Sequence, residues 1–152
     1  MRKFSGTGYV GFIEGDTEEN ENYRQVLFTG DHLQLVLMSL KPGEEIGDEV
    51  HEDTDQFFRI EQGKAKFVFN ESEEHLVEEG DAVVIPAGTY HNVLNNSPTE
   101  PLKLYTVYTD PQHPDGAVYK TKAEAETEEK GNNAGSSATK NEKEGGLFDD
   151  DL

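Results

Sequence analysis

Residues 42–63 read PGEEIGDEVHEDTDQFFRIEQG, and three side chains of this stretch can bind a metal ion. Glu49 and His51 are separated by one residue, and Gln56 follows five positions later. Side chains of an extended segment alternate between its two faces, so Glu49 and His51 share one face if the segment is a strand. The stretch therefore predicts part of a metal site, which needs a further ligand from elsewhere in the chain.

The chain on both sides of this stretch has the pattern of short strands. Residues 23–29 alternate in polarity, and residues 33–40 are apolar on both faces, which is typical of a strand covered on both sides. Residues 55–62 and 64–70 flank Gly63 and predict a hairpin with a tight turn at that glycine. Further strands are expected at 74–79, 82–85, 90–95 and 102–109. Turn signals recur about every ten residues, which indicates an all-β sandwich or barrel.

The two ends of the chain lack this pattern. Residues 1–22 show neither helical nor strand periodicity, and we expect a mostly irregular N-terminal arm. Residues 121–130 are the expected helix, which is short and almost wholly charged. From Gly131 the sequence is polar and of low complexity, which predicts disorder. The expected organisation is an arm at 1–22, a β-barrel at 23–119 and a charged, disordered acidic tail at 120–152.

Composition limits the possible partners and the location. The 152 residues suit one domain with a tail, and the net charge of -19 disfavours binding to nucleic acid or to anionic membranes. There is no cysteine, which excludes disulfides, thiolate nucleophiles and iron–sulfur ligation. The start of the sequence has no secretory signal pattern and no apolar run suits a membrane helix, so we expect a cytoplasmic protein.

A second motif, GDAVVIPAGTYHNVLN at residues 80–95, offers the missing ligand as His91. Its spacing, G-x5-P-x-G-x2-H-x3-N, matches the second motif of the cupins. The spacing from Gly43 to Gly63 matches the first cupin motif, G-x5-H-x-H-x4-E-x6-G. The chain therefore resembles a small single-domain cupin, which implies a jelly-roll β-barrel.

The candidate ligand set departs from that of the family. Cupins usually present His, His, Glu and His, whereas the matching positions here are Glu49, His51, Gln56 and His91. Both sets contain one carboxylate, so the ligand charge is unchanged. This favours a working metal centre over the alternative, in which Glu49 and Gln56 are solvated rim residues and the barrel is empty. The expected cofactor is one divalent transition metal, with Mn, Fe, Zn, Ni and Co all compatible.

Strand parity predicts which side chains line the barrel. The expected inward positions are Gln56, Phe58, Ile60, Leu102, Leu104, Thr106 and Tyr108. Tyr108 is the candidate catalytic residue, as a proton-handling group near the metal; the alternative is a core tyrosine with a satisfied hydroxyl. His113 is expected to be a solvated loop histidine, with closure over the barrel mouth as the alternative. Phe57 and Tyr105 point outward and need cover, so we expect a homodimer, which the cupin resemblance also implies.

Three functions are compatible with these features. The first is an isomerase-like enzyme that uses its metal as a Lewis acid on a small sugar-like substrate or a hydroxy or keto acid. It is supported by a limited resemblance to sugar-phosphate isomerases of the cupin class, although no evident Lys or Arg cluster is available to hold a phosphate. The second is an iron-dependent dioxygenase, indicated by the two histidines and one carboxylate. The third is a non-catalytic module that binds a metal or a small ligand.

Overall fold

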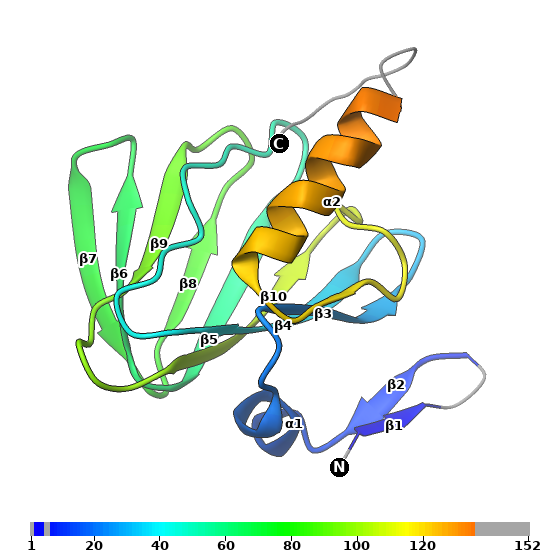
Figure 1. Cartoon of the computed structure of the whole chain (residues 1–152), viewed down its shortest axis with the longest axis horizontal. Helices are drawn as coiled ribbons and strands as arrows, with labels where there is room; N and C mark the ends of the chain where they lie inside the picture. Colours follow the sequence, from blue (N-terminus) through cyan, green and yellow to red (C-terminus); the bar gives the residue numbers. More distant parts are fainter. Residues whose placement is uncertain (1, 5–6, 136–152) are drawn as a thin grey trace.

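The computed structural model describes residues 2–4 and 7–135, which form a β-structure built mainly from two antiparallel sheets (Figure 1). The larger sheet has the strand order β11-β3-β4-β10-β5-β8. Its strands are β3 (Arg24–Thr29), β4 (Gln34–Leu40), β5 (Gln56–Gln62), β8 (Ala82–Ile85), β10 (Leu102–Tyr108) and β11 (Val118–Tyr119). The smaller sheet has the order β7-β6-β9, with β6 (Lys64–Phe69), β7 (Glu73–Glu78) and β9 (His91–Asn95). The all-β fold expected from the sequence is confirmed.

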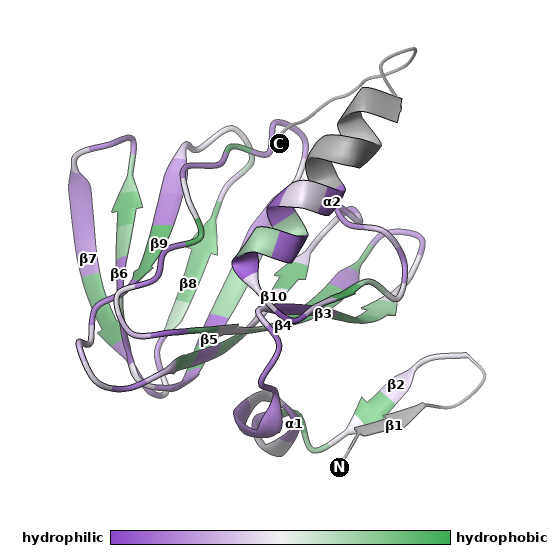
Figure 2. Ribbon diagram, in the orientation of Figure 1, coloured by the Kyte–Doolittle hydropathy of each residue, from purple (hydrophilic) through white to green (hydrophobic). Residues whose placement is uncertain are grey.

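The core lies between the two sheets. Phe58 of β5 and Phe67 of β6 meet edge to face, with ring centroids 5.0 Å apart, and both are buried. The inward positions predicted by strand parity in β5 and β10 are all buried. Strand segments are the main hydrophobic regions in Figure 2, whereas the polar β7 is largely exposed. Burial of these apolar faces is what holds the sheets together.

Gly63 is a corner between the sheets. The hairpin predicted at this position is wrong, because β5 pairs with β10 and β8, whereas β6 pairs with β7 and β9. Gly63 has a φ of 95°, and a Cβ atom there would lie 2.6 Å from the carbonyl oxygen of Pro101. The local sequence shows that the chain turns here, but the choice of partner strands depends on residues far away in the sequence.

The N-terminal region has more regular structure than its composition predicts. A small hairpin, β1 (Arg2–Phe4) with β2 (Tyr9–Gly11), is followed by helix α1 (Ile13–Glu19). The Tyr9 hydroxyl donates to Asp16 over 2.7 Å, and Thr17 is fully buried. A helix of seven residues is marginal alone, so its packing against β10 and β5 must stabilise it. The periodicity of the sequence does not predict this tertiary contact.

Helix α2 (Lys122–Gly135) confirms the predicted charged helix and continues beyond it. Ala125 is buried and joins the start of the helix to the core. The helix includes residues 131–135, for which the sequence predicted disorder, and the rest of that prediction, 136–152, lies outside the described residues. Among the described helices, none has the length and apolar character needed to cross a membrane.

Candidate metal centre

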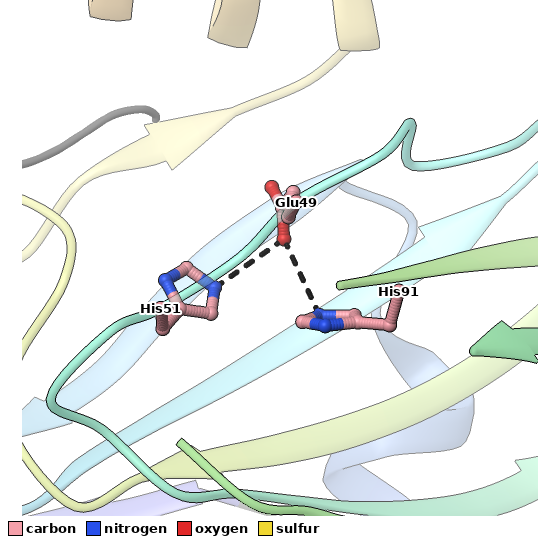
Figure 3. A group of neighbouring side chains, drawn as sticks. All are labelled: Glu49, His51 and His91. Atoms are coloured by element: carbon pink, nitrogen blue, oxygen red, sulfur yellow. Dashed lines mark ion pairs between the residues drawn. The ribbon is translucent and has the colours of Figure 1, made fainter. Parts of the chain in front are cut away.

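Glu49, His51 and His91 come together from two separate parts of the chain (Figure 3). Glu49 and His51 lie in the segment between β4 and β5, and His91 is the first residue of β9. Two backbone hydrogen bonds of 2.8 Å, one in each direction, pair Glu49 with His91. This isolated bridge places the side chains of Glu49 and His91 next to each other through backbone contacts alone.

The carboxylate of Glu49 lies between the two imidazoles. Its Oε1 is 3.5 Å from Nε2 of His51 and 4.0 Å from Nε2 of His91, and the candidate ligand atoms all lie within 4.8 Å of one another. Metal–ligand bonds of about 2.0–2.2 Å place neighbouring ligand atoms roughly 3–4 Å apart around one ion. The Glu49 carboxylate therefore has the spacing to share one metal ion with each of the two histidines.

The two imidazoles present unused nitrogen atoms. Nε2 of His51 and Nε2 of His91 are buried and have no hydrogen-bond partner. In His91, Nδ1 lies 2.9 Å from the carbonyl oxygen of Thr89. A carbonyl oxygen can only accept a hydrogen bond. Nδ1 therefore carries the hydrogen and Nε2 presents its lone pair, as a metal ligand requires.

The ionisation states also favour metal binding. Burial by itself raises the pKa of Glu49, but the close contact with His51 and the charges of His51, Arg24 and His91 outweigh it and lower the pKa to about 2. Burial lowers the pKa of His91, against the attraction of Glu49. The stable forms are thus a carboxylate and a neutral imidazole, which are the forms that coordinate a metal.

Gln56 of β5 is buried, which contradicts the alternative of a solvated rim residue. Its Nε2 donates to the Thr106 hydroxyl over 2.9 Å, and that hydroxyl donates to the carbonyl oxygen of Phe57 over 2.9 Å. Because the Thr106 proton is already used, Thr106 must accept from the amide NH₂ group. This fixes the amide orientation and leaves Oε1 of Gln56 buried without a partner. The role of Gln56 as a fourth ligand stays a prediction.

Comparison with known proteins gives the family. The family model described as "Cupin domain" matches residues 36–108. The chain is 45% identical over 130 residues to the uncharacterized protein YrkC of Bacillus subtilis, covering 82% of this chain and 69% of YrkC. This chain belongs to the cupin family. The uncharacterized protein L612 of Acanthamoeba polyphaga mimivirus is 47% identical over 112 residues, covering 72% of this chain and 70% of L612.

Solved structures with a similar fold agree with this assignment. The crystal structure of BH2720 from Bacillus halodurans matches with a TM-score of 0.78 and 42% identity, over 84% of this chain and 99% of that one. TT1209 from Thermus thermophilus matches with a TM-score of 0.58 and 26% identity, over 66% of this chain and 96% of that one. The jelly-roll barrel implied by the two sequence motifs is therefore confirmed.

Tyr108 of this cupin lies next to the candidate metal cluster of Glu49, His51 and His91. It is 2% exposed, and its ring meets the His51 ring edge to face at 5.5 Å between centroids. Its hydroxyl is 3.1 Å from Nε2 of His113. The expected inward orientation of Tyr108 is confirmed, and its catalytic role stays a prediction.

His113 is half-buried, so the expectation of a solvated loop histidine is wrong. The side chain of Gln34 binds the backbone around His113. Oε1 of Gln34 accepts hydrogen bonds from the backbone N–H groups of Gln112 and His113, and Nε2 of Gln34 donates one to the carbonyl oxygen of His113. Gln34 is fully buried in β4. The sequence pattern does not predict this contact, because Gln34 and His113 are 79 positions apart. The one available signal is a glutamine within an apolar strand, since a buried amide needs a hydrogen-bond partner.

Proposed function

We propose that this cupin binds one divalent transition metal through Glu49, His51 and His91, with Gln56 as the fourth ligand, and uses it in isomerase-like chemistry. The observation that carries the proposal is the set of buried donor atoms without hydrogen-bond partners: Nε2 of His51, Nε2 of His91 and Oε1 of Gln56. Unpaired buried polar atoms are costly, and native structures rarely keep them without a reason. Metal coordination supplies that reason for all three together.

The donor set determines what the metal can do. A bound divalent ion supplies Lewis acidity, which polarises a carbonyl or hydroxyl group of the substrate. The set contains one anionic ligand, Glu49, and neutral donors otherwise. An amide oxygen donates more weakly than a carboxylate, so Gln56 leaves a bound metal more electrophilic than a second carboxylate beside Glu49 would.

Tyr108 and His113 are the groups that handle protons in the proposed reaction. The Tyr108 hydroxyl lies within hydrogen-bonding distance of His113, and its ring lies beside the His51 ring. A phenol and an imidazole in contact can pass a proton in either direction as a substrate carbon loses or regains one. This arrangement fits proton transfer between neighbouring carbons of a small hydroxy-carbonyl compound, such as a sugar-like molecule or a hydroxy or keto acid.

The test is deuterium exchange, followed by proton NMR, on protein loaded separately with each of Mn, Fe, Zn, Ni and Co. The panel consists of unphosphorylated aldoses, ketoses and hydroxy and keto acids in D₂O. We expect deuterium next to a carbonyl in at least one class of compound, and a loss of about 10²-fold or more in Tyr108→Phe. Tyr105→Phe, on the outward face of the same strand, is the matched control and should exchange at the wild-type rate.

Absence of exchange from every compound, in protein shown to hold the metal, would contradict the isomerase-like proposal. That result would support the non-catalytic binding module. The iron-dependent dioxygenase is the second candidate, and it rests on the presence of two histidines and one carboxylate in the cluster. Substrate-dependent oxygen uptake by the Fe(II)-loaded protein with diols or thiols, together with no deuterium exchange, would favour it.

A further inference from the structure

A second polar pocket lies away from the metal cluster. It has a volume of about 420 Å³, and residues of β4, β5 and β10, the end of the α1 region and the start of α2 line it. On β10, Lys103 of this pocket is five residues from Tyr108, a separation of about 17 Å along a strand. Strand parity also puts the two side chains on opposite faces of the sheet. The pocket is therefore separate from the metal centre.

The floor of the pocket is a row of three polar side chains on adjacent strands. Lys103 of β10 is in register with Ser39 of β4 on one side and with Gln62 of β5 on the other. The register shift next to Leu104 is what brings Gln62 opposite Lys103. A hydroxyl, an ammonium and an amide thus line the same cavity. Together they offer hydrogen-bond donors to a ligand that rests on the sheet.

Lys103 is a buried charge with few partners. Its side chain is 5% exposed, and its Nζ donates to the carbonyl oxygen of Asn20. The carboxylate of Glu21 is 3.9 Å from Nζ, too far for a hydrogen bond, and is itself 91% exposed. An ammonium group has three N–H donors, and burying it without acceptors is costly. An anion in the pocket would supply the missing acceptors.

Three further lysines line the same pocket: Lys41, Lys120 and Lys122. Four of the 13 Lys and Arg residues of a chain with net charge -19 therefore meet at one place. They outnumber the three acidic residues of the lining, Glu18, Glu21 and Glu44. Spacing along the sequence does not predict this cluster, because its members are spread from position 41 to position 122.

We propose that this lysine pocket is a binding site for a small organic anion whose phosphate or carboxylate group contacts Lys103 and whose hydroxyl or amino groups face the three glutamates. The lining contains both lysines and glutamates, which suits a ligand that has an anionic group and hydrogen-bond donors. Such a ligand would connect the α1 region and the start of α2 to the sheet. It would therefore stabilise the folded chain, and the stabilisation would grow with the logarithm of its concentration once that exceeds the Kd.

The experiment is titration calorimetry and thermal unfolding of the full chain at low salt, with inorganic phosphate, glycerol phosphate, malate and serine as probes. Lys41→Gln/Lys120→Gln removes two charges of the pocket, and because both residues are exposed we expect the variant to fold like the wild type. Lys64→Gln/Lys66→Gln on β6 is the control, because it removes the same charge elsewhere. We expect at least one probe to bind saturably with a Kd of about 1 mM or tighter, weakened about tenfold by the pocket variant and unchanged by the control.

Three results would overturn the proposal. The first is no saturable binding of any of the four probes. The second is equal weakening in the pocket variant and in the control, which would show general attraction by charge. The third is loss of binding in His91→Ala, which would place the anion at the metal cluster. Preference for phosphate over malate, or the reverse, identifies the anionic group.

Discussion

At the residue scale, Gln56 is the position where this chain departs most informatively from other cupins. Its amide is held by Thr106, which directs Oε1 away from the hydroxyl and leaves it unpaired. We predict that Gln56→Leu lowers metal affinity by at least about tenfold, since a ligand is lost, and that Gln56→Glu raises it because a second carboxylate adds charge. Competition with a chelator of known affinity measures both changes.

Thr106→Val tests how the amide is oriented. It removes the hydroxyl that holds Gln56 while keeping the side-chain shape, and we expect metal affinity to fall by about tenfold, as for other groups that orient a ligand. Gln62→Leu, on β5 like Gln56 but outside the cluster, should bind metal like the wild type. Unchanged affinity in Gln56→Leu would show that Gln56 is not a ligand.

The ionisation of Glu49 gives a prediction for the metal-free protein. The folded-state pKa is about 2, compared with an ordinary value of 4.5, so the carboxylate contributes stability that is present above pH 4.5 and is lost as the pH falls towards 2. We predict that wild type is more stable than Glu49→Gln at pH 6 and that the difference shrinks between pH 4.5 and pH 2. Urea unfolding with chelator present, at several pH values, measures it; a difference independent of pH would contradict the prediction.

At the scale of the elements, Gly63 determines how the chain passes from β5 to β6. Gly63 has a positive φ, and an added Cβ atom would also lie too close to Pro101. We therefore predict that Gly63→Ala destabilises the fold by about 2–4 kcal/mol. Gly80 has a similar φ of 91° and nothing within 4 Å of an added Cβ. Gly80→Ala should therefore lower the free energy of unfolding by about 1 kcal/mol, because only the strained backbone conformation is penalised. Equal costs in chemical denaturation would contradict this account of the corner.

The two sequence motifs and the strands around Gly63 show which parts of the fold could be predicted from the sequence and which could not. Residue spacing within 42–63 and 80–95 predicted the barrel and brought Glu49, His51 and His91 to one site, because each motif is local and strand parity is regular. The partner strands on either side of Gly63 were mispredicted because pairing depends on distant residues. Long-range contacts likewise position α1 and His113, and local periodicity contains no information about them.

At the scale of the whole molecule, the outward face of β5, β8 and β10 is the proposed contact between two copies of the chain. Phe57 and Tyr105 lie side by side on this face, with ring centroids 6.2 Å apart, and the neighbouring Val84 is 62% exposed. Exposed apolar groups next to aromatic rings are typical of interfaces. We predict a homodimer in solution that Val84→Glu shifts towards monomer, as measured by light scattering coupled to size exclusion.

Leu76→Glu is the control for the dimer prediction. Leu76 is 71% exposed on β7, in the other sheet, so this change adds the same charge outside the proposed interface. A wild-type monomer at all concentrations, or equal dissociation of both variants, would contradict the assignment of this face.

The central claim is that Glu49, His51 and His91 hold a metal ion, and elemental analysis of protein purified without added metal tests it most directly. The comparison is between wild type, Glu49→Ala/His91→Ala and the control Glu73→Ala/His75→Ala, which removes an exposed carboxylate–imidazole pair from β7. We predict about one divalent ion per chain in wild type and in the control, and almost none in the cluster variant. Equal metal content in all three proteins would contradict the claim.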